Sequence, residues 1–337
     1  MLFAQSDDLN TKLNGFKSQN DLSNWIYEQL DEANANPSKA VANLQKAQKE
    51  RWRNTKTPDE HFAWLNLLST LGYYELLDGN ILGSISMYEN ALGFFQQHQI
   101  LSYDIVEYVL KPLSNNYTRL GDYERALYLQ KQSINFQRAY SEDPSKMANI
   151  YGNMAISYRS MSRLADAHRS IESGFDLKPD AKTRIMLNNV LADVLYDEGN
   201  YTKAALVIQQ NIKAQTATDH ESAYWLMGTY TTAGNVQLEL KQYAKGREFY
   251  QKALTLVNKY YPYGRLREKA NLFTQLAKTF LASKQPKEAI AYSHQSLSTL
   301  GIMQNKAIIN QKIFGDYKVV DAFMQLAKAQ LMLQKPE

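Results

Sequence analysis

The chain of 337 residues contains no cysteine. Disulfide bonds, a thiol nucleophile and thiolate metal ligands are therefore excluded. Helix-breaking residues are also few, with eight prolines and 15 glycines, and this scarcity favours long uninterrupted helices. No apolar run approaches the ~18 residues that a membrane-spanning helix needs, so we expect no membrane insertion.

Neither sign of charge is in large excess, because 38 basic residues accompany 34 acidic ones. A formal net charge of +4 without a basic stripe gives no reason to expect a nucleic-acid partner. The five histidines lie far apart, and none has a metal-ligand neighbour at helical spacing. Phosphate-binding glycine loops and nucleophile-elbow motifs are missing as well.

These absences predict no catalytic residues, no metal site, no cofactor and a chain that is not an enzyme. A hydrolase whose site is assembled from distant parts of the chain is the weakest alternative.

The first residues, "MLFAQSDD", have two interpretations. They resemble the end of a bacterial secretory signal with cleavage beside Ala4, or they form a frayed terminus. We assign residues 1–20 to a flexible N-terminal segment. The compartment stays open between cytoplasm and periplasm.

The chain does contain an internal repeat of small residues, with intervals of 44, 42, 41, 37, 42 and 43 residues. Its anchor positions are Ala40, Ser84, Ala126, Ala167, Ala204, Gly246 and Ala289. Seven residues later stand Ala47, Ala91, Ser133, Gly174, Asn211, Ala253 and Ser296, and twelve residues before the anchors stand Glu28, Gly72, Ser114, Ala155, Ala192, Gly234 and Ala277. Three small positions in one frame predict two antiparallel helices that cross closely in every repeat.

Larger residues at helical spacing are expected to fill the space around each crossing. They are Tyr117, Tyr158, Leu195 and Phe280 in the first helices, and Tyr88, Ile171, Ile208 and Tyr250 in the second helices. The turns between the helices are predicted at Gly79-Asn80, Gly121-Asp122, Gly199-Asn200 and Pro286. Glycine adopts the left-handed conformation that ends a helix, and Asn or Asp caps the next one.

The small residues together with "LGDY" at Leu120–Tyr123 and "EGNY" at Glu198–Tyr201 resemble the tetratricopeptide repeat. The resemblance implies an all-α, right-handed superhelix (α-solenoid) of about seven antiparallel helix pairs plus a terminal helix. We place an array over 21–337, with repeats at 21–56, 60–100, 105–140, 146–180, 183–217, 222–260 and 266–300 and a partial one at 317–337.

The first repeat matches weakly, because Glu28 and Asp31 replace small and aromatic residues. The intervals exceed the usual ~34 residues and reach the HEAT and armadillo range, but those repeats lack this turn signature. We assign the extra residues to longer helices and to loops at 140–146 and 260–268.

Two stretches, "VLKPLSNNYTRLGDYERAL" and "IMLNNVLADVLYDEGNYTKA", resemble the arrays that precede caspase-like CHAT peptidase domains in bacterial proteins. This resemblance implies the sensor or scaffold part of a larger protein, whose cysteine centre lies outside this chain. In addition, "FMQLAKAQLMLQKPE" parallels "LFTQLAKTFLASKQPKE". It predicts one helix of an eighth repeat whose partner helix lies beyond Glu337, with a terminal capping helix as the alternative.

The tetratricopeptide resemblance implies a concave groove lined by the first helix of each repeat. Asparagine recurs at groove positions, including Asn189 and Asn235. It is a poor helix former, and its amide can pair with the backbone of an extended peptide. Bridging between neighbouring helices, or simple solvation of the groove, is the alternative.

Lys111, Asn115 and Asn153 resemble the first three residues of the clamp with which some tetratricopeptide modules hold a C-terminal carboxylate. Met186 and Val190 occupy the places of the remaining pair, so the clamp is partial. Arg119 and Arg159 add positive charge nearby.

We therefore predict a non-catalytic scaffold for a protein or peptide segment, acidic or C-terminal, or for the chain's own missing C-terminal domain. The alternative is the regulatory region of a CHAT-type enzyme. The predicted peptide-binding residues are Lys111, Asn115, Asn153, Arg119, Arg159, Asn189 and Asn235. We expect the side chains of Lys111, Asn115 and Asn153 to be mostly exposed.

Overall fold

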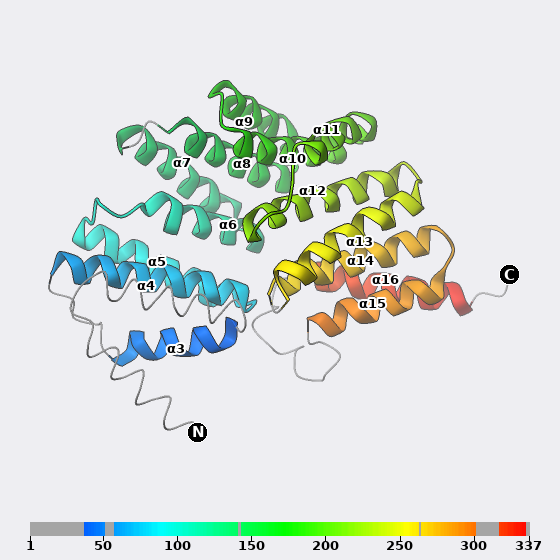
Figure 1. Cartoon of the computed structure of the whole chain (residues 1–337), viewed down its shortest axis with the longest axis horizontal. Coiled ribbons are helices and arrows are strands. Elements are labelled where there is room, and N and C mark those ends of the chain that lie inside the picture. The colour runs from blue at the N-terminus through cyan, green and yellow to red at the C-terminus, as the bar shows by residue number, and fades with distance from the viewer. Residues whose placement is uncertain (1–36, 51–56, 141–142, 263, 301–316, 335–337) are drawn as a thin grey trace. The chain divides into compact units, whose positions relative to one another are not determined.

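The structure, a computed structural model, describes residues 37–50, 57–140, 143–262, 264–300 and 317–334. Within these ranges all regular elements are helices and no strand occurs (Figure 1). The predicted all-α class is therefore confirmed. The predicted segment 1–20, the cleavage site at Ala4, and the weak first-repeat positions Glu28 and Asp31 lie outside the described residues.

The chain divides into two compact units, Met1–Tyr117 and Thr118–Glu337. The first unit contains α3 (Pro37–Glu50), α4 (Pro58–Leu77), α5 (Ile81–His98), the π-helix η1 (Val106–Leu110) and most of α6 (Lys111–Leu120). The second contains α7 (Tyr123–Tyr140), α8 (Pro144–Ser160), α9 (Leu164–Asp176), α10 (Ala181–Asp197), α11 (Tyr201–Lys213), α12 (His220–Glu239), α13 (Tyr243–Tyr260), α14 (Leu266–Ala282), α15 (Pro286–Thr299) and α16 (Tyr317–Gln334).

The turns between paired helices share one backbone conformation. A residue with positive φ, between 57° and 87°, stands five positions before each anchor from Ser84 onward. These residues are Gly79, Gly121, Ser162, Gly199, Lys241 and Lys284. In the turn after α10, the Asn200 N–H donates to the Leu195 carbonyl at 2.8 Å, which satisfies a carbonyl that the helix end leaves unpaired. The four predicted turns are thus confirmed, and three of the six turns, those at Ser162, Lys241 and Lys284, do without glycine.

The small residues of the repeat frame are buried at the helix crossings. Every described anchor is buried, from Ala40 to Ala289, and so are the described residues seven places later and twelve places before. The side chain of Ala47 lies outside the described part. A Cβ on Gly246 would stand 3.3 Å from the carbonyl oxygen of Gly234, so the anchor of a second helix packs directly on the first helix of its own hairpin.

Large residues fill the space beside these crossings, as predicted. Tyr88, Ile171, Ile208 and Tyr250 are at most 3% exposed. Tyr117 and Leu195 are also buried, whereas Tyr158 and Phe280 are half-buried. The core therefore follows the repeat frame from one hairpin to the next.

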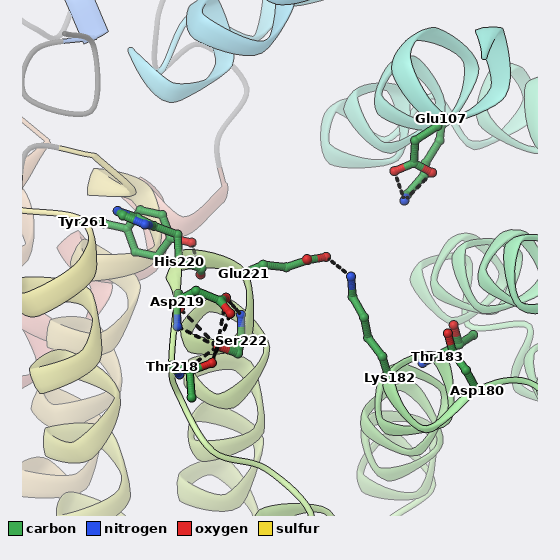
Figure 2. Close-up of polar contacts among 11 residues, drawn as sticks. Glu107, Asp180, Lys182, Thr183, Thr218, Asp219, His220, Glu221, Ser222 and Tyr261 are labelled. Atoms are coloured by element: carbon green, nitrogen blue, oxygen red, sulfur yellow. Dashed lines mark hydrogen bonds and ion pairs between the residues drawn. The ribbon is translucent and has the colours of Figure 1, made fainter. Parts of the chain in front are cut away.

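Three successive first helices of the second unit begin with an aspartate cap. Asp143, Asp180 and Asp219 precede α8, α10 and α12, and each accepts a backbone N–H of the first turn. Figure 2 shows the start of α12, where Asp219 and Ser222 face each other in a capping box. Close by, Lys182 of α10 forms an ion pair with Glu221 of α12 at 2.5 Å. Backbone hydrogen bonds from Thr183 and Ser222 hold the pKa of Asp180 and Asp219, respectively, below the usual value.

The loop between α11 and α12 is fastened to the end of α13. The Tyr260 hydroxyl donates to the Ala217 carbonyl at 3.0 Å, and the Tyr261 hydroxyl donates to the His220 carbonyl.

The helices are long, with 20 residues in α4 and in α12, which accounts for much of the repeat length. None of the described helices has the length and hydrophobicity of a membrane span.

Candidate peptide-binding surface

An ion-pair cluster joins three successive first helices of the second unit, α8, α10 and α12. Arg159 Nε donates to Asp197 Oδ2 at 2.6 Å, and Arg159 Nη1 donates to Asp193 Oδ2 at 3.1 Å. Thr232 Oγ1 donates to Asp193 Oδ1 at 2.8 Å. We name Arg159, Asp193, Asp197 and Thr232 the Arg159 cluster. It holds one positive and two negative side chains, so its formal charge is −1.

The Arg159 cluster is accessible to a ligand. The side chains of Arg159, Asp193 and Asp197 are 28%, 31% and 32% exposed. Such partial exposure means that water, or a peptide group that replaces it, can reach the outer edges of the three charged groups. Because both carboxylates already accept from the guanidinium, the cluster is held in place before any ligand arrives.

A second polar group lies next to the Arg159 cluster, around Asn189 of α10. Asn189 Oδ1 accepts from Asn211 Nδ2 of α11 at 2.8 Å and from Thr229 Oγ1 of α12 at 2.9 Å. Asn211 is 1% exposed and Thr229 is 0% exposed. The carboxamide oxygen of Asn189 therefore joins three helices, which is the helix-bridging role that the sequence left open.

Tyrosine hydroxyls complete the row of polar contacts on α10 and α12. Tyr196 donates to Glu239 Oε1 at 3.1 Å, and Tyr250 of α13 donates to Asn235 Oδ1 at 2.8 Å. Burial raises the pKa of Tyr196, and the neighbouring Glu239 raises it further. Burial likewise raises the pKa of Tyr250. Both phenols are consequently neutral hydrogen-bond donors at pH 7.

The residues that resemble a carboxylate clamp are divided between the two units. Lys111 and Asn115 lie on α6 in the first unit, and Asn153 lies on α8 in the second. Lys111 Nζ bonds both carboxylate oxygens of Glu107, at 2.8 and 3.0 Å. Asn153 Nδ2 donates to Asn149 Oδ1 at 3.4 Å.

All seven predicted binding side chains are half-buried, so the expectation that those of Lys111, Asn115 and Asn153 are mostly exposed is wrong. For Lys111 the reason is its ion pair with Glu107, which leaves 27% of the lysine side chain exposed. Arg119 at the end of α6 is also half-buried, and burial lowers its pKa. In the second unit the structure brings Arg159 and Asn189 into the polar row of α8, α10 and α12, with Asn235 further along α12.

Sequence reasoning missed the ion pairs of Arg159 with Asp193 and Asp197. The available signal was the i,i+4 spacing of the two aspartates, which places both carboxylates on one face of α10. Asn211 was a second signal, because it stands at a position that is small in the other repeats. Its amide is accommodated there by a hydrogen bond of 2.8 Å to the Ile185 carbonyl.

Among the described residues, no group of three or more histidine, aspartate or glutamate side chains has an arrangement that could hold a metal ion. In these parts of the chain the candidate surface therefore consists of amides, hydroxyls and paired charges. Such groups recognise the polar backbone and charged side chains of a peptide.

No protein-family model matches the chain, and no curated protein is similar to it in sequence. Solved structures are similar in fold. A Rap protein complexed with competence and sporulation factor superposes with a TM-score of 0.59 at 13% identity, over 96% of this chain and 88% of that one. A tetratricopeptide repeat protein from Parabacteroides merdae gives a TM-score of 0.55 at 16% identity, over 94% of this chain and all of the other.

A third similar structure is a signal-transduction ATPase with numerous domains and a tetratricopeptide repeat sensor, from Pyrococcus horikoshii. Its TM-score is 0.53 at 17% identity, over 89% of this chain. This chain spans 43% of that protein's length. At these identities the comparisons establish the fold, and they show that the chain folds as a helical repeat array of the tetratricopeptide type.

Proposed function

We propose that the chain is a non-catalytic scaffold that binds a protein or peptide segment along its first helices. The observation that carries this proposal is the row of half-buried polar groups on α8, α10 and α12, from Arg159 to Glu239. Packing of one hairpin on the next does not require charged groups, and the buried residues at the hairpin crossings are uncharged and mostly small or apolar. Polar groups held in position and open on one side offer donors and acceptors to an extended backbone.

In this proposal Asn153, Arg159, Asn189 and Asn235 contact the backbone of the bound segment. In the first unit Lys111 and Asn115 hold a carboxylate, either acidic or C-terminal, and in the second unit Arg119 contributes a positive charge. The Rap protein of similar fold was solved in complex with competence and sporulation factor, and this gives the proposal a precedent. The fold class, in which stacked helix pairs present extended binding surfaces, supports it too.

The test begins with a phage-display selection of peptides on the whole chain. The selected peptide is then titrated against the wild type and against Lys111→Ala and Asn153→Ala. We expect Lys111→Ala to weaken binding about tenfold, the value of one charge-assisted hydrogen bond, and Asn153→Ala to weaken it about fivefold, the value of one neutral hydrogen bond. Arg169→Ala is the matched control, because Arg169 is 71% exposed on the second helix α9. It should bind as the wild type does.

Melting temperatures separate binding from folding in this experiment. The Lys111–Glu107 pair is a partly exposed ion pair, so its loss should change the stability by well under ~1 kcal/mol. Unchanged affinity in both Lys111→Ala and Asn153→Ala, or an equal loss in Arg169→Ala, would contradict the proposed surface. If a copy of the peptide with an amidated C-terminus binds as well as the free acid, the proposed contact with a C-terminal carboxylate is contradicted.

A second candidate function is the sensor region of a larger bacterial protein with a caspase-like CHAT domain. It is favoured by the two sequence stretches named above and by the similar fold of an ATPase that carries a tetratricopeptide repeat sensor. The test uses the absence of cysteine from this chain. Natural protein isolated from its source cells should react with iodoacetamide if a cysteine peptidase domain is attached, and a protein that takes up no label would exclude this candidate.

A further inference from the structure

Basic residues are concentrated in the part of the second unit that contains α13, α14 and α15. Eleven of the chain's 38 lysine and arginine residues lie between residues 240 and 300, together with three of its 34 aspartate and glutamate residues. The formal net charge of the whole chain is only +4, so the positive charge is local. An asymmetry of this kind indicates a surface that attracts an anionic partner.

Two turns in this part of the chain lie side by side. Arg247 belongs to α13, close to the turn between α12 and α13, and its Nη1 donates to Ser283 Oγ at 3.1 Å. Ser283 lies in the turn between α14 and α15. The guanidinium of Arg247 also lies over the ring of Phe280, with Cζ 4.8 Å from the ring centroid. The two turns therefore form one edge of the second unit.

Four exposed lysines stand on this edge. Lys241 and Lys245 come from the turn before α13 and from its start, and Lys284 and Lys287 occupy the same region before and within α15. In the described part of the chain, none of the four forms an ion pair or a side-chain hydrogen bond. We refer to these four lysines and Arg247 as the basic edge. The four lysine charges are open to a ligand.

The carboxylates close to the basic edge do not neutralise it. Glu248 accepts from Lys252 at 2.6 Å. This hydrogen bond, together with the charges of Lys252 and Lys245, holds the pKa of Glu248 below its usual value. Glu288 stands in the first turn of α15, and Glu239, which ends α12, accepts a hydrogen bond from α10. With these three carboxylates and Lys252 counted, the formal charge of the edge is still +3.

Lys241 and Lys284 stand at positions that disfavour a lysine. Their φ angles are 59° and 57°, in the left-handed region, where the corresponding turns carry Gly79, Gly121 and Gly199. A side chain is disfavoured in this backbone conformation, and a cation is disfavoured beside the N-terminus of a helix. No ion pair within the described array compensates either lysine. A strained position that packing does not explain points to a role in binding.

We propose that the basic edge binds an acidic segment of a partner protein, whose Asp or Glu side chains reach both turns. Charge complementarity carries this proposal, because carboxylates would accept hydrogen bonds from the open lysines. The residues before α13 and α15, Gln242 and Gln285, form no side-chain cap, so the positive ends of these two helices favour the same negative charge.

The surroundings of the basic edge distinguish an acidic protein segment from other polyanions. Among the described large apolar and aromatic side chains between residues 240 and 300, Leu266 alone is exposed, and it lies at the opposite end of α14. The edge therefore lacks an aromatic platform for the bases of a single-stranded nucleic acid and apolar side chains for insertion into a membrane surface. The basic edge consists of turns and second helices, so it is distinct from the polar row of α8, α10 and α12.

The test uses a fluorescein-labelled peptide of ten glutamates as the probe, titrated against the whole chain by fluorescence anisotropy. In the double variant Lys241→Gly/Lys284→Gly the probe should bind about tenfold more weakly, because two charge pairs are lost. The affinity should also depend less on salt. The same variant should melt at a higher temperature, because glycine suits the left-handed backbone. Lysines with a structural role would lower the melting temperature when they are replaced.

Matched variants make the test specific. Lys245→Gln/Lys287→Gln leaves both turns unchanged and should also weaken binding about tenfold. Lys131→Gln/Lys213→Gln is the control, because these lysines are exposed on the second helices α7 and α11. The control loses the same charge outside the basic edge and should bind as the wild type does.

Four results would overturn the proposal. The first is a wild-type chain that does not bind the glutamate probe, and the second is an equal loss of affinity in the control variant. The third is a thymidine decanucleotide that binds more tightly than the peptide and is weakened by the same two lysine variants, which would identify a nucleic-acid surface. The fourth is an Asp7→Asn/Asp8→Asn/Asp21→Asn chain that binds the probe more tightly than the wild type, which would show that the chain's own acidic residues occupy the edge.

Discussion

The hairpins α10/α11 and α12/α13 are neighbours that share one repeat frame but place different pairs of residues where their two helices cross. In α10/α11 the first helix contributes Ala192, and Ile208 of the second helix lies beside it, 3% exposed. In α12/α13 the same places are taken by Gly234 and Tyr250. A Cβ on Gly234 would lie 2.3 Å from Cε1 of the tyrosine ring.

The difference shows that the two residues at a crossing are chosen together. A glycine admits a tyrosine, and an alanine admits an isoleucine, so the helices stay close in both hairpins. The first unit repeats the larger combination, because a Cβ on Gly72 would lie 3.0 Å from the ring of Tyr88. The larger residue also reaches further, since the Tyr250 hydroxyl bonds Asn235 on α12 at 2.8 Å.

The largest effect on stability is expected when the alanine of one hairpin is combined with the tyrosine of the other. Gly234→Ala should destabilise the chain by about 1–3 kcal/mol, because the added methyl group meets a ring that is fully buried. In the double variant Gly234→Ala/Tyr250→Ile the α10/α11 pair is recreated, and part of the loss should be recovered. Urea unfolding of the two single variants and the double variant measures the coupling. Strictly additive changes would show that the two positions are independent.

A smaller effect is expected at the start of α10. Asp180→Ala should destabilise by about 1 kcal/mol, the usual cost of losing an N-cap. The pKa of Asp180 is lowered by the backbone bond from Thr183, so its contribution is present above the unfolded pKa of ~3.9 and is lost as the pH falls through the folded value.

The control is Asp180→Asn, which keeps the cap without the titration. It should match the wild type at pH 7 and lose less stability in acid. Chemical denaturation at pH 7 and pH 3 decides this, and an Asn variant as acid-sensitive as the wild type would contradict the assignment.

The smallest effect concerns the turns, which again differ between the two hairpins. Gly199 ends α10 with φ 75°, and Lys241 ends α12 with φ 59°. Because a side chain is disfavoured in the left-handed region, Lys241→Gly should stabilise by about 0.5–1 kcal/mol, and Gly199→Lys should destabilise by about the same amount. Thermal melts of the two variants check the signs. A destabilising Lys241→Gly together with a stabilising Gly199→Lys would contradict a shared turn conformation. No change in the melting temperature of either variant would contradict it as well.

The sequence was sufficient to predict the hairpins, because the three small positions are imposed by backbone contact and have few alternatives. The turns at Gly79, Gly121 and Gly199 were predictable because glycine adopts the left-handed conformation most readily. Those at Ser162 and Lys241 were not marked by a residue type, since the surrounding helices hold the left-handed conformation there. The Arg159 cluster could not be predicted, because its contacts depend on how α8 and α10 are offset along their axes.

For the candidate surface, residue types in the sequence indicated which positions are polar, but they did not indicate which partners these side chains bind. Asn189 was selected as a polar residue at an inward position, and the structure shows its carboxamide oxygen engaged with Asn211 and Thr229. Lys111 was selected for its resemblance to a clamp residue, whereas its partner in the structure is Glu107, the acid that i,i+4 helical spacing favours.

The central claim is that a partner segment lies along the first helices of the second unit. Photo-crosslinking of the selected peptide tests it most directly, with p-benzoylphenylalanine placed either at Thr231 on α12 or at Glu172 on α9. Thr231 is half-buried on a first helix, and Glu172 is exposed on a second helix. The account predicts crosslinked peptide from position 231 and none from position 172. Crosslinking from position 172 with none from position 231 would contradict it.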